Sequence, residues 1–448
     1  MKLKEKILLV LILATAFFLR VWRYYDFPVG GETADESAWT LLGASLIQER
    51  VPASWSYFLP YENYHYVEGL FDAPIVRPAL DHPPLFSLVP GTAHSLKSFW
   101  LDSPSFKVIR LPMVLLGTLN VLLFWFVVRQ IFAQTKWVVL ATALFATIPT
   151  IVFGSRLVVA ENLLITWILL AMLLVFRRPT KQRTLWLVLI SIAAVLTKVA
   201  GLIVPISLLV YGLLTRQKIV ARTGVVGGLL GIGLFAFYGV VYNWPLFVAV
   251  VAIQSTRALG LATLQNRLFL NPVLVKHIFF DGWQVMGIMA AVALLLHRSN
   301  DKKLLLAHIF TVASLLFIAL SVGESTFHGW YDFVLWPSLI ISLAGFLKIL
   351  FETSNTLLFG IFWLMTLPVM RLALVFTDQY EHLAGWLVRV MIGLGFLPLL
   401  WQTLDRQKLV RITPWLLLIG LLGFNVVTIL TVSHEAYWVQ AAFFELPL

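Results

Sequence analysis

The sequence predicts an all-α polytopic membrane protein with about 13 transmembrane helices and one long loop after the first of them. Two observations lead to this fold class. Of 448 residues, 60% are hydrophobic and 12% are charged, whereas soluble domains are about a quarter charged. Apolar stretches of roughly the length needed to cross a bilayer also recur along the whole chain. We therefore expect most of the apolar segments to lie in a lipid bilayer and not in water.

The first apolar stretch, residues 7–22, follows Lys2, Lys4 and Lys6 and has no small-residue cleavage site after it. We interpret it as a retained helix and not as a signal peptide. The segment 184–197 is short for a bilayer, and two interpretations stay open: a full crossing, or a hairpin with the next segment. The other expected spans are residues 108–128, 137–153, 157–176, 199–214, 223–243, 283–297, 303–321, 333–350, 357–376, 384–401 and 412–432.

The net charge of +11 is best explained by topology. With a cytoplasmic N-terminus, more than half of the 33 lysines and arginines fall in short loops on the inner side, and most acidic residues do not. The positive-inside rule then predicts a multi-pass protein with that orientation, and the plasma (inner) membrane is the expected location. Membrane lipids are expected neighbours, and we expect no nucleic-acid partner. The chain has no cysteine, which excludes disulfides and thiolate chemistry.

The expected organisation has five parts. Residues 23–107 contain no apolar span of membrane length and are rich in acidic and aromatic residues. Long loops of this kind are functional or disordered. The aromatic residues argue against disorder, so we expect amphipathic interfacial helices on the membrane surface. The parts are the first helix (1–22), an extracytoplasmic loop with candidate catalytic carboxylates (23–107), transmembrane helices (108–243), a second extracytoplasmic loop (244–282), and C-terminal transmembrane helices with a short outer tail (283–448).

Asp35 and Glu36 open a stretch, residues 37–50, with apolar residues at helical spacing. One interpretation is local: Thr33 and Glu36 have the spacing of a capping box. The other is functional: two carboxylates just outside the membrane act as a general base or bind a cation.

Asp81 and His82 precede two prolines, which suit the start of a helix over about residues 85–99. The alternative interpretation is a simple turn.

Arg110, Arg156 and Lys198 lie near the outer ends of expected helices. Ionisable groups inside a membrane cost about 2.5 to 3.5 kcal/mol, so they usually have a partner or a function. A shared phosphate is one partner that suits several cations. Snorkelling to the headgroups is the alternative for Lys198, and Glu161 is an alternative partner for Arg156.

A late cluster on the same predicted face is either an interfacial aromatic belt or part of a site. Its members are Glu324, His328, Trp330, Tyr331 and Asp332.

In chain order, these segments resemble the polytopic GT-C glycosyltransferases, and specifically glycosyltransferase family 39, which includes protein O-mannosyltransferases and aminoarabinose transferases. The resemblance covers about residues 20 to 205. It rests on Asp35-Glu36, Asp81-His82-Pro83-Pro84-Leu85, Arg110-Leu111-Pro112, Ser155-Arg156 with Glu161, and Leu196-Thr197-Lys198.

The resemblance implies an enzyme that transfers a hexosyl or pentosyl group from a polyprenyl-phosphate-linked donor, with inversion, on the extracytoplasmic face. Asp35 would be the general base, supported by Glu36. The resemblance further implies donor-phosphate contacts from Arg110, Lys198, Arg156 and Arg257, and a sugar or acceptor site formed by Asp81, His82, His328 and Tyr331.

The sequence departs from the family at His328-Gly329-Trp330-Tyr331-Asp332, where relatives often have an arginine with a tyrosine. The soluble C-terminal domain that some relatives carry is also not expected. The acceptor is left open between a lipid, a glycan and a protein. No cofactor and no metal site is assigned, and whether a divalent cation takes part stays open. Two other classes remain: a transporter or lipid flippase without transferase activity, and a scaffold that binds a lipid carrier.

Overall fold

The structure is a computed structural model, and it confirms the predicted fold class. It describes residues 2–31, 33–67, 73–256, 281–297, 301–322, 329–353, 356–370, 381–404 and 407–432. Each expected span falls on a helix. The helices are α1 (Leu3–Val21), α5 (Leu111–Ile131), α6 (Thr135–Thr147), α7 (Pro149–Gly154), α8 (Glu161–Val175), α9 (Lys181–Thr197), α10 (Ile203–Leu214), α11 (Lys218–Tyr242), α14 (Trp283–Leu296), α15 (Lys302–Ser321), α16 (Trp336–Thr353), α17 (Thr356–Met370), α18 (Glu381–Thr403) and α19 (Gln407–Thr431).

Within the part of the chain that the structure describes, five helical stretches are long and apolar enough to cross a membrane. Several other expected spans are shorter apolar helices, so the number of crossings stays a prediction. The five stretches are Phe106–Ile131, Lys218–Tyr242, Lys302–Ser321, Gly329–Thr353 and Ile412–Thr431.

Two expected spans are interrupted for local reasons. Pro149 divides the span expected at 137–153 into α6 and α7, because a proline has no N–H to continue the helix. Lys198 is extended, with φ −165° and ψ 152°, and it separates α9 from the 3₁₀ turn η2 (Val199–Leu202) that leads into α10. Lys198 therefore lies at an interruption between two apolar helices.

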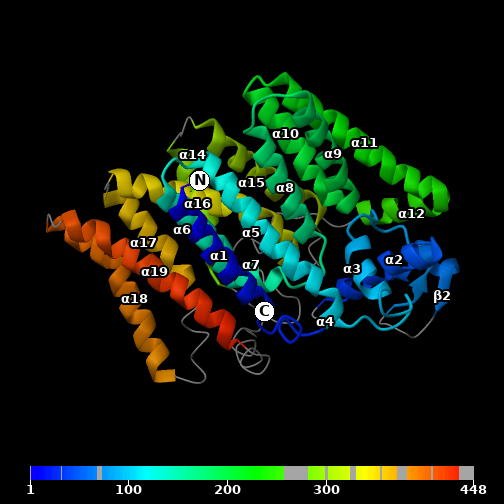
Figure 1. Ribbon diagram of the computed structural model, residues 1–448, viewed down its shortest axis with the longest axis horizontal. Coiled ribbons are helices and arrows are strands. Elements are labelled where there is room, and N and C mark those ends of the chain that lie inside the picture. Colours follow the sequence, from blue (N-terminus) through cyan, green and yellow to red (C-terminus); the bar gives the residue numbers. More distant parts are fainter. Residues whose placement is uncertain are drawn as a thin grey trace.

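Figure 1 shows the helices as one bundle, with the segments between α1 and α5 gathered at one end of it. These segments form an ordered unit of helices and a small antiparallel sheet of order β1-β3-β2. Its elements are α2 (Asp35–Glu49), β1 (Ser54–Trp55), η1 (Leu59–Tyr64), β2 (His65–Val67), β3 (Ile75–Val76), α3 (Leu88–Ser95) and α4 (Phe106–Ile109).

The helix expected over residues 37–50 is confirmed as α2, which begins slightly earlier, at Asp35. The helix expected over about 85–99 is shorter, because α3 begins only at Leu88. The backbone N–H of Leu85 donates instead to the carbonyl of Leu196, at 3.1 Å. The prolines before α3 therefore lie in a turn, and this turn is tied to the end of α9.

The crossing of α2 and α3 depends on two glycines. A Cβ added to Gly43 would lie 1.8 Å from the carbonyl oxygen of Ser87, and one added to Gly91 would lie 2.4 Å from the carbonyl carbon of Gly43. The two backbones therefore touch directly, and no side chain fits between them.

We expect Gly43→Ala to lower the free energy of unfolding by about 1–3 kcal/mol, because the added methyl group forces the helices apart. Thermal unfolding of the detergent-solubilised protein measures this change. The matched control is Gly233→Ala in α11, where an added Cβ meets nothing within 4 Å and alanine favours the helix. Equal melting temperatures for Gly43→Ala and the control variant would contradict the close contact.

Two further elements complete the description. An apolar helix, α12 (Trp244–Ser255), occupies the start of the segment expected to be the second loop, and residues 257–280 of that segment lie outside the described residues. A 3₁₀ helix, η3 (Gly329–Leu335), precedes α16 and brings Tyr331 towards the end of the bundle that holds α2.

Candidate active site

Glu36 and Arg110 form a buried ion pair between α2 and the start of α5. Both residues are 0% exposed. The arginine Nε donates to Glu36 Oε1 at 2.8 Å and Nη2 donates to Oε2 at 2.7 Å, which is a bidentate geometry. The remaining guanidinium N–H groups donate to the backbone carbonyls of Tyr24, Pro28 and Val29. All five donors of Arg110 are thus used within the protein.

This geometry gives Arg110 a role other than the phosphate contact that the family resemblance implied. It holds the first turn of α2 against α5, and Glu36 Oε1 also accepts a hydrogen bond from the backbone N–H of Val158 at 3.0 Å. The capping-box interpretation is wrong, because the Glu36 side chain turns to Arg110 and α2 has no side-chain cap. Thr33 instead accepts a hydrogen bond from the N–H of Asp35 at 3.1 Å.

Glu161 and Lys198 form a second buried ion pair, between the start of α8 and the end of α9. The ammonium nitrogen Nζ of Lys198 lies 2.6 Å from Glu161 Oε1. Lys198 is only 6% exposed and Glu161 only 1%. Nζ also lies 4.3 Å from the centre of the Tyr331 ring, a cation–π contact. Snorkelling of Lys198 is therefore wrong, and so is the pairing of Glu161 with Arg156. Lys198 and Tyr331 were both expected to belong to the site, and the structure places them in contact.

Asp35 lies at the junction of these pairs. Successive residues of a helix point about 100° apart, so Asp35 points away from the buried direction that Glu36 takes, and it is half-buried. Its carboxylate interacts electrostatically with both Lys198 and Glu161. The site therefore has one partly exposed carboxylate within electrostatic range of an ammonium group that a second carboxylate holds in place.

Asp81 is held firmly by its own loop. Its carboxylate oxygens accept hydrogen bonds from the hydroxyls of Ser56, at 2.9 Å, and of Tyr61. Burial and the neighbouring Asp81 carboxylate raise the pKa of Tyr61 well above its ordinary value, so this hydroxyl stays a donor. Next to it, the half-buried His82 ring stacks on Trp39, which is 2% exposed, with ring centres 4.7 Å apart. Asp81 thus shapes the loop, and the buried Trp39 ring holds His82 in place.

We expect Tyr61→Phe to lower the free energy of unfolding by about 1–3 kcal/mol, because the half-buried Asp81 carboxylate and the buried N–H of Leu80 each lose a hydrogen bond. Tyr61 is 0% exposed, and its hydroxyl both donates to Asp81 and accepts from the N–H of Leu80 at 2.7 Å. The change is measured by thermal unfolding at neutral pH. Tyr57→Phe, at a largely exposed tyrosine of the same loop, is the control. An unchanged melting temperature for Tyr61→Phe would contradict the account.

Arg156 is buried and uses its Nη atoms on backbone carbonyls. It donates to Phe27 at 2.7 Å and to Leu19 at 2.6 Å. Its neighbour Arg20, which the sequence analysis missed, is 0% exposed and donates to the carbonyl of Ala146 at 3.1 Å. The only signal for Arg20 was a charge near the end of the first apolar span. Both arginines hold the end of α1 in the bundle.

Some expected site residues lie outside the described residues: Glu324, His328 and Arg257. Of the late cluster, Asp332 is buried and accepts a hydrogen bond from Gln284 at 3.1 Å. Within the described ranges, no group of three or more histidine, aspartate or glutamate side chains is placed to hold a metal ion.

Comparison with solved structures shows which known fold the chain resembles. ArnT from Cupriavidus metallidurans bound to undecaprenyl phosphate superposes with a TM-score of 0.57 at 16% identity, over 97% of this chain and 78% of that one. Its apo form gives 0.51 at 15% identity, over 96% and 77%. The archaeal oligosaccharyltransferase AglB from Archaeoglobus fulgidus, in complex with an inhibitory peptide and a dolichol-phosphate, gives 0.50 at 12% identity, over 96% and 56%. The fold is that of the GT-C membrane glycosyltransferases.

The sequence agrees with this class. Residues 81–244 match the family described as Dolichyl-phosphate-mannose-protein mannosyltransferase, and the matched segment includes Arg110, Glu161 and Lys198. No curated protein matches the sequence. The family match over residues 81–244 and the fold agree with the resemblance to glycosyltransferase family 39.

Proposed function

We propose that this protein transfers a sugar from a polyprenyl-phosphate-linked donor to an acceptor hydroxyl on the extracytoplasmic face of the plasma membrane, with inversion at the anomeric carbon. The observation that carries the proposal is the Asp35 carboxylate within electrostatic range of the Lys198 ammonium group. A base and a fixed cation at one place are what this reaction needs. The ligands of two structural relatives, undecaprenyl phosphate and a dolichol-phosphate, support a donor of this kind.

Asp35 acts as the general base in this proposal. The acceptor oxygen attacks the anomeric carbon while its proton passes to the Asp35 carboxylate, and the bond from that carbon to the phosphate oxygen breaks. The oxygen approaches from the side opposite the phosphate, so the configuration inverts. The phosphate leaves with additional negative charge, which the Lys198 ammonium group stabilises.

The two buried ion pairs position these groups. Glu36 and Arg110 fix the first turn of α2, and therefore the direction of Asp35. Glu161 and the Tyr331 ring fix the ammonium group of Lys198, which has three donors, one of them given to Glu161. A stationary charge costs no reorganisation when the phosphate leaves.

The sugar is proposed to lie near the half-buried His82 ring, which stacks on Trp39, close to the end of α9 to which the loop before α3 is tied. We also propose Arg257 as a further phosphate contact and His328 as a residue of the acceptor site. The acceptor is a lipid, a glycan or a protein that presents a hydroxyl group.

A combined binding and turnover experiment tests the proposal. Native mass spectrometry of the gently purified protein is expected to detect a bound polyprenyl-phosphate sugar. In proteoliposomes, addition of hydroxyl acceptors is expected to release the free polyprenyl phosphate. Movement of the donor across the bilayer without turnover would instead identify a transporter or flippase. A bound donor whose sugar is not transferred to any added acceptor would identify a scaffold.

A further inference from the structure

A large cavity lies at the end of the bundle far from the candidate active site. It has a volume of about 740 Å³ and lies between the N-terminal halves of α1, α6 and α19. Leu8, Leu140, Leu418 and Leu422 contribute to its apolar wall. Asp35 and Lys198 lie near the opposite end of α1, where Arg156 binds the carbonyl of Leu19. The cavity is therefore separate from the proposed transferase chemistry.

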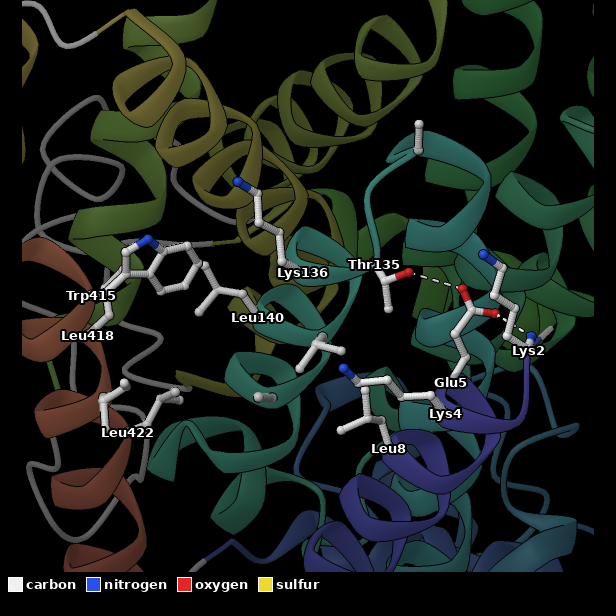
Figure 2. Close-up of a pocket in the computed structure, with 14 residues that line it drawn as sticks. Lys2, Lys4, Glu5, Leu8, Thr135, Lys136, Leu140, Trp415, Leu418 and Leu422 are labelled. Atoms are coloured by element: carbon white, nitrogen blue, oxygen red, sulfur yellow. Dashed lines mark hydrogen bonds between the residues drawn. The ribbon is translucent and has the colours of Figure 1, made fainter. Parts of the chain in front are cut away.

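Three lysines line this apolar cavity, and Figure 2 shows Lys4 extending from α1 into the space towards α19. The ammonium groups of Lys2, Lys4 and Lys136 have no ion-pair partner among the described residues. Lys136 lies over the Trp137 ring at 4.9 Å, which supplies no negative charge.

Glu5, the one carboxylate among the lining residues, is already occupied. Its Oε1 accepts from Arg129 at 2.7 Å and from the Thr135 hydroxyl at 3.0 Å, and its Oε2 accepts from the backbone N–H of Lys2 at 2.9 Å. Figure 2 draws the bonds from Thr135 and Lys2. The mouth of the cavity thus has an excess of positive charge above an apolar interior.

We propose that this cavity binds an anionic glycerophospholipid, with its phosphate among the three lysines and an acyl chain along the leucines. Basic pockets between membrane helices bind anionic headgroups, and each lysine near the membrane surface contributes to the attraction. The volume lies within the range of ligand pockets, about 300–1,000 Å³. A free phosphate would leave the apolar wall uncovered, and a neutral lipid would leave the lysines unneutralised.

The lipid would join α19 to the core of the bundle. Beside the cavity, Trp415 of α19 stacks on Trp137 of α6, with ring centres 5.5 Å apart, and it also packs on Phe351 at 4.9 Å. Figure 1 shows α18 and α19 on the outer side of the bundle. A lipid that bridges α1, α6 and α19 therefore adds contacts beside these aromatic rings, at the N-terminal part of α19.

Native mass spectrometry of the full chain, released from nanodiscs that contain phosphatidylglycerol and phosphatidylcholine, tests the proposal. The wild type is expected to retain phosphatidylglycerol in preference to phosphatidylcholine, and phosphatidylglycerol is expected to raise its melting temperature. The triple variant Lys2→Gln, Lys4→Gln, Lys136→Gln is expected to lose this preference, by about fivefold for each lysine. The control triple variant, Lys181→Gln, Lys218→Gln, Lys302→Gln, changes exposed lysines at the starts of other helices and should keep the preference.

A second variant changes the apolar wall without changing charge. Ala143→Phe fills the cavity and is expected to exclude phosphatidylglycerol while all three lysines remain. Equal retention of the two lipids by the wild type would overturn the proposal. Undiminished retention of phosphatidylglycerol by both the lysine variant and Ala143→Phe would also overturn it. Selective retention of a polyprenyl phosphate in this cavity would overturn it as well.

Discussion

Replacement of Asp35 by asparagine is expected to reduce sugar transfer by about 10²- to 10⁴-fold, the usual contribution of a general base. The amide has nearly the same size but cannot accept the acceptor proton. The change is measured as the rate of polyprenyl phosphate release by the purified protein in proteoliposomes. The fall should appear in kcat and not in the KM for the donor, because Asp35 does not bind the phosphate in this account.

Asp26→Asn is the matched control for this prediction. Asp26 lies in the same loop, is 42% exposed, and is 3.6 Å from Arg23 in a surface ion pair, so its loss should leave transfer unchanged. Asp35→Glu retains a base at a displaced position and should recover part of the rate. Wild-type transfer by a folded Asp35→Asn protein would remove Asp35 as the base.

Replacement of Arg110 by methionine is expected to destabilise the protein by about 3–5 kcal/mol, because it leaves a buried carboxylate without its partner. Glu36 is 0% exposed and receives two of its hydrogen bonds from Arg110. Thermal unfolding of the solubilised variant measures the loss. Arg178→Met, at an exposed arginine between α8 and α9, is the control and should unfold like the wild type.

The double variant Glu36→Gln, Arg110→Met separates the ion pair from general disruption. Removal of both charges leaves no unpaired carboxylate, so this variant should be more stable than Arg110→Met alone. A double variant that is less stable than the single one would show that Arg110 acts mainly through packing and its bonds to carbonyl groups. A single variant with the wild-type melting temperature would contradict the buried pair itself.

Most of the helices were predictable, because an apolar stretch of membrane length is a local property of the sequence. The small sheet was not, because Ser54–Trp55 and Ile75–Val76 are too short to show alternation and pair only through the fold. The break at Lys198 was visible as a charge between two apolar spans. Its extended backbone, and the bond from Leu85 that ties the loop to α9, depend on packing between distant segments.

The candidate site, like the fold, was predictable from the sequence only in part. Sequence order singled out Asp35 and Lys198 as candidate site residues but assigned their partners incompletely. Glu36 and Arg110 are 74 positions apart, and Glu161 and Lys198 are 37 apart, so helix packing decides which charges meet. One sequence signal for the second pair existed, because an acid at the start of an apolar span requires a cation when it is buried.

In the proposed mechanism Asp35 moves the proton and Lys198 holds the phosphate, and binding and transfer measured on the same variants separate these two roles. Native mass spectrometry would measure the binding of a polyprenyl phosphate to folded Asp35→Asn and Lys198→Met proteins, each also assayed for transfer. We expect Asp35→Asn to bind like the wild type yet lose transfer. We expect Lys198→Met to bind about tenfold more weakly, the loss of one charge-assisted hydrogen bond. Wild-type binding by Lys198→Met, or lost binding by Asp35→Asn, would contradict this division of roles.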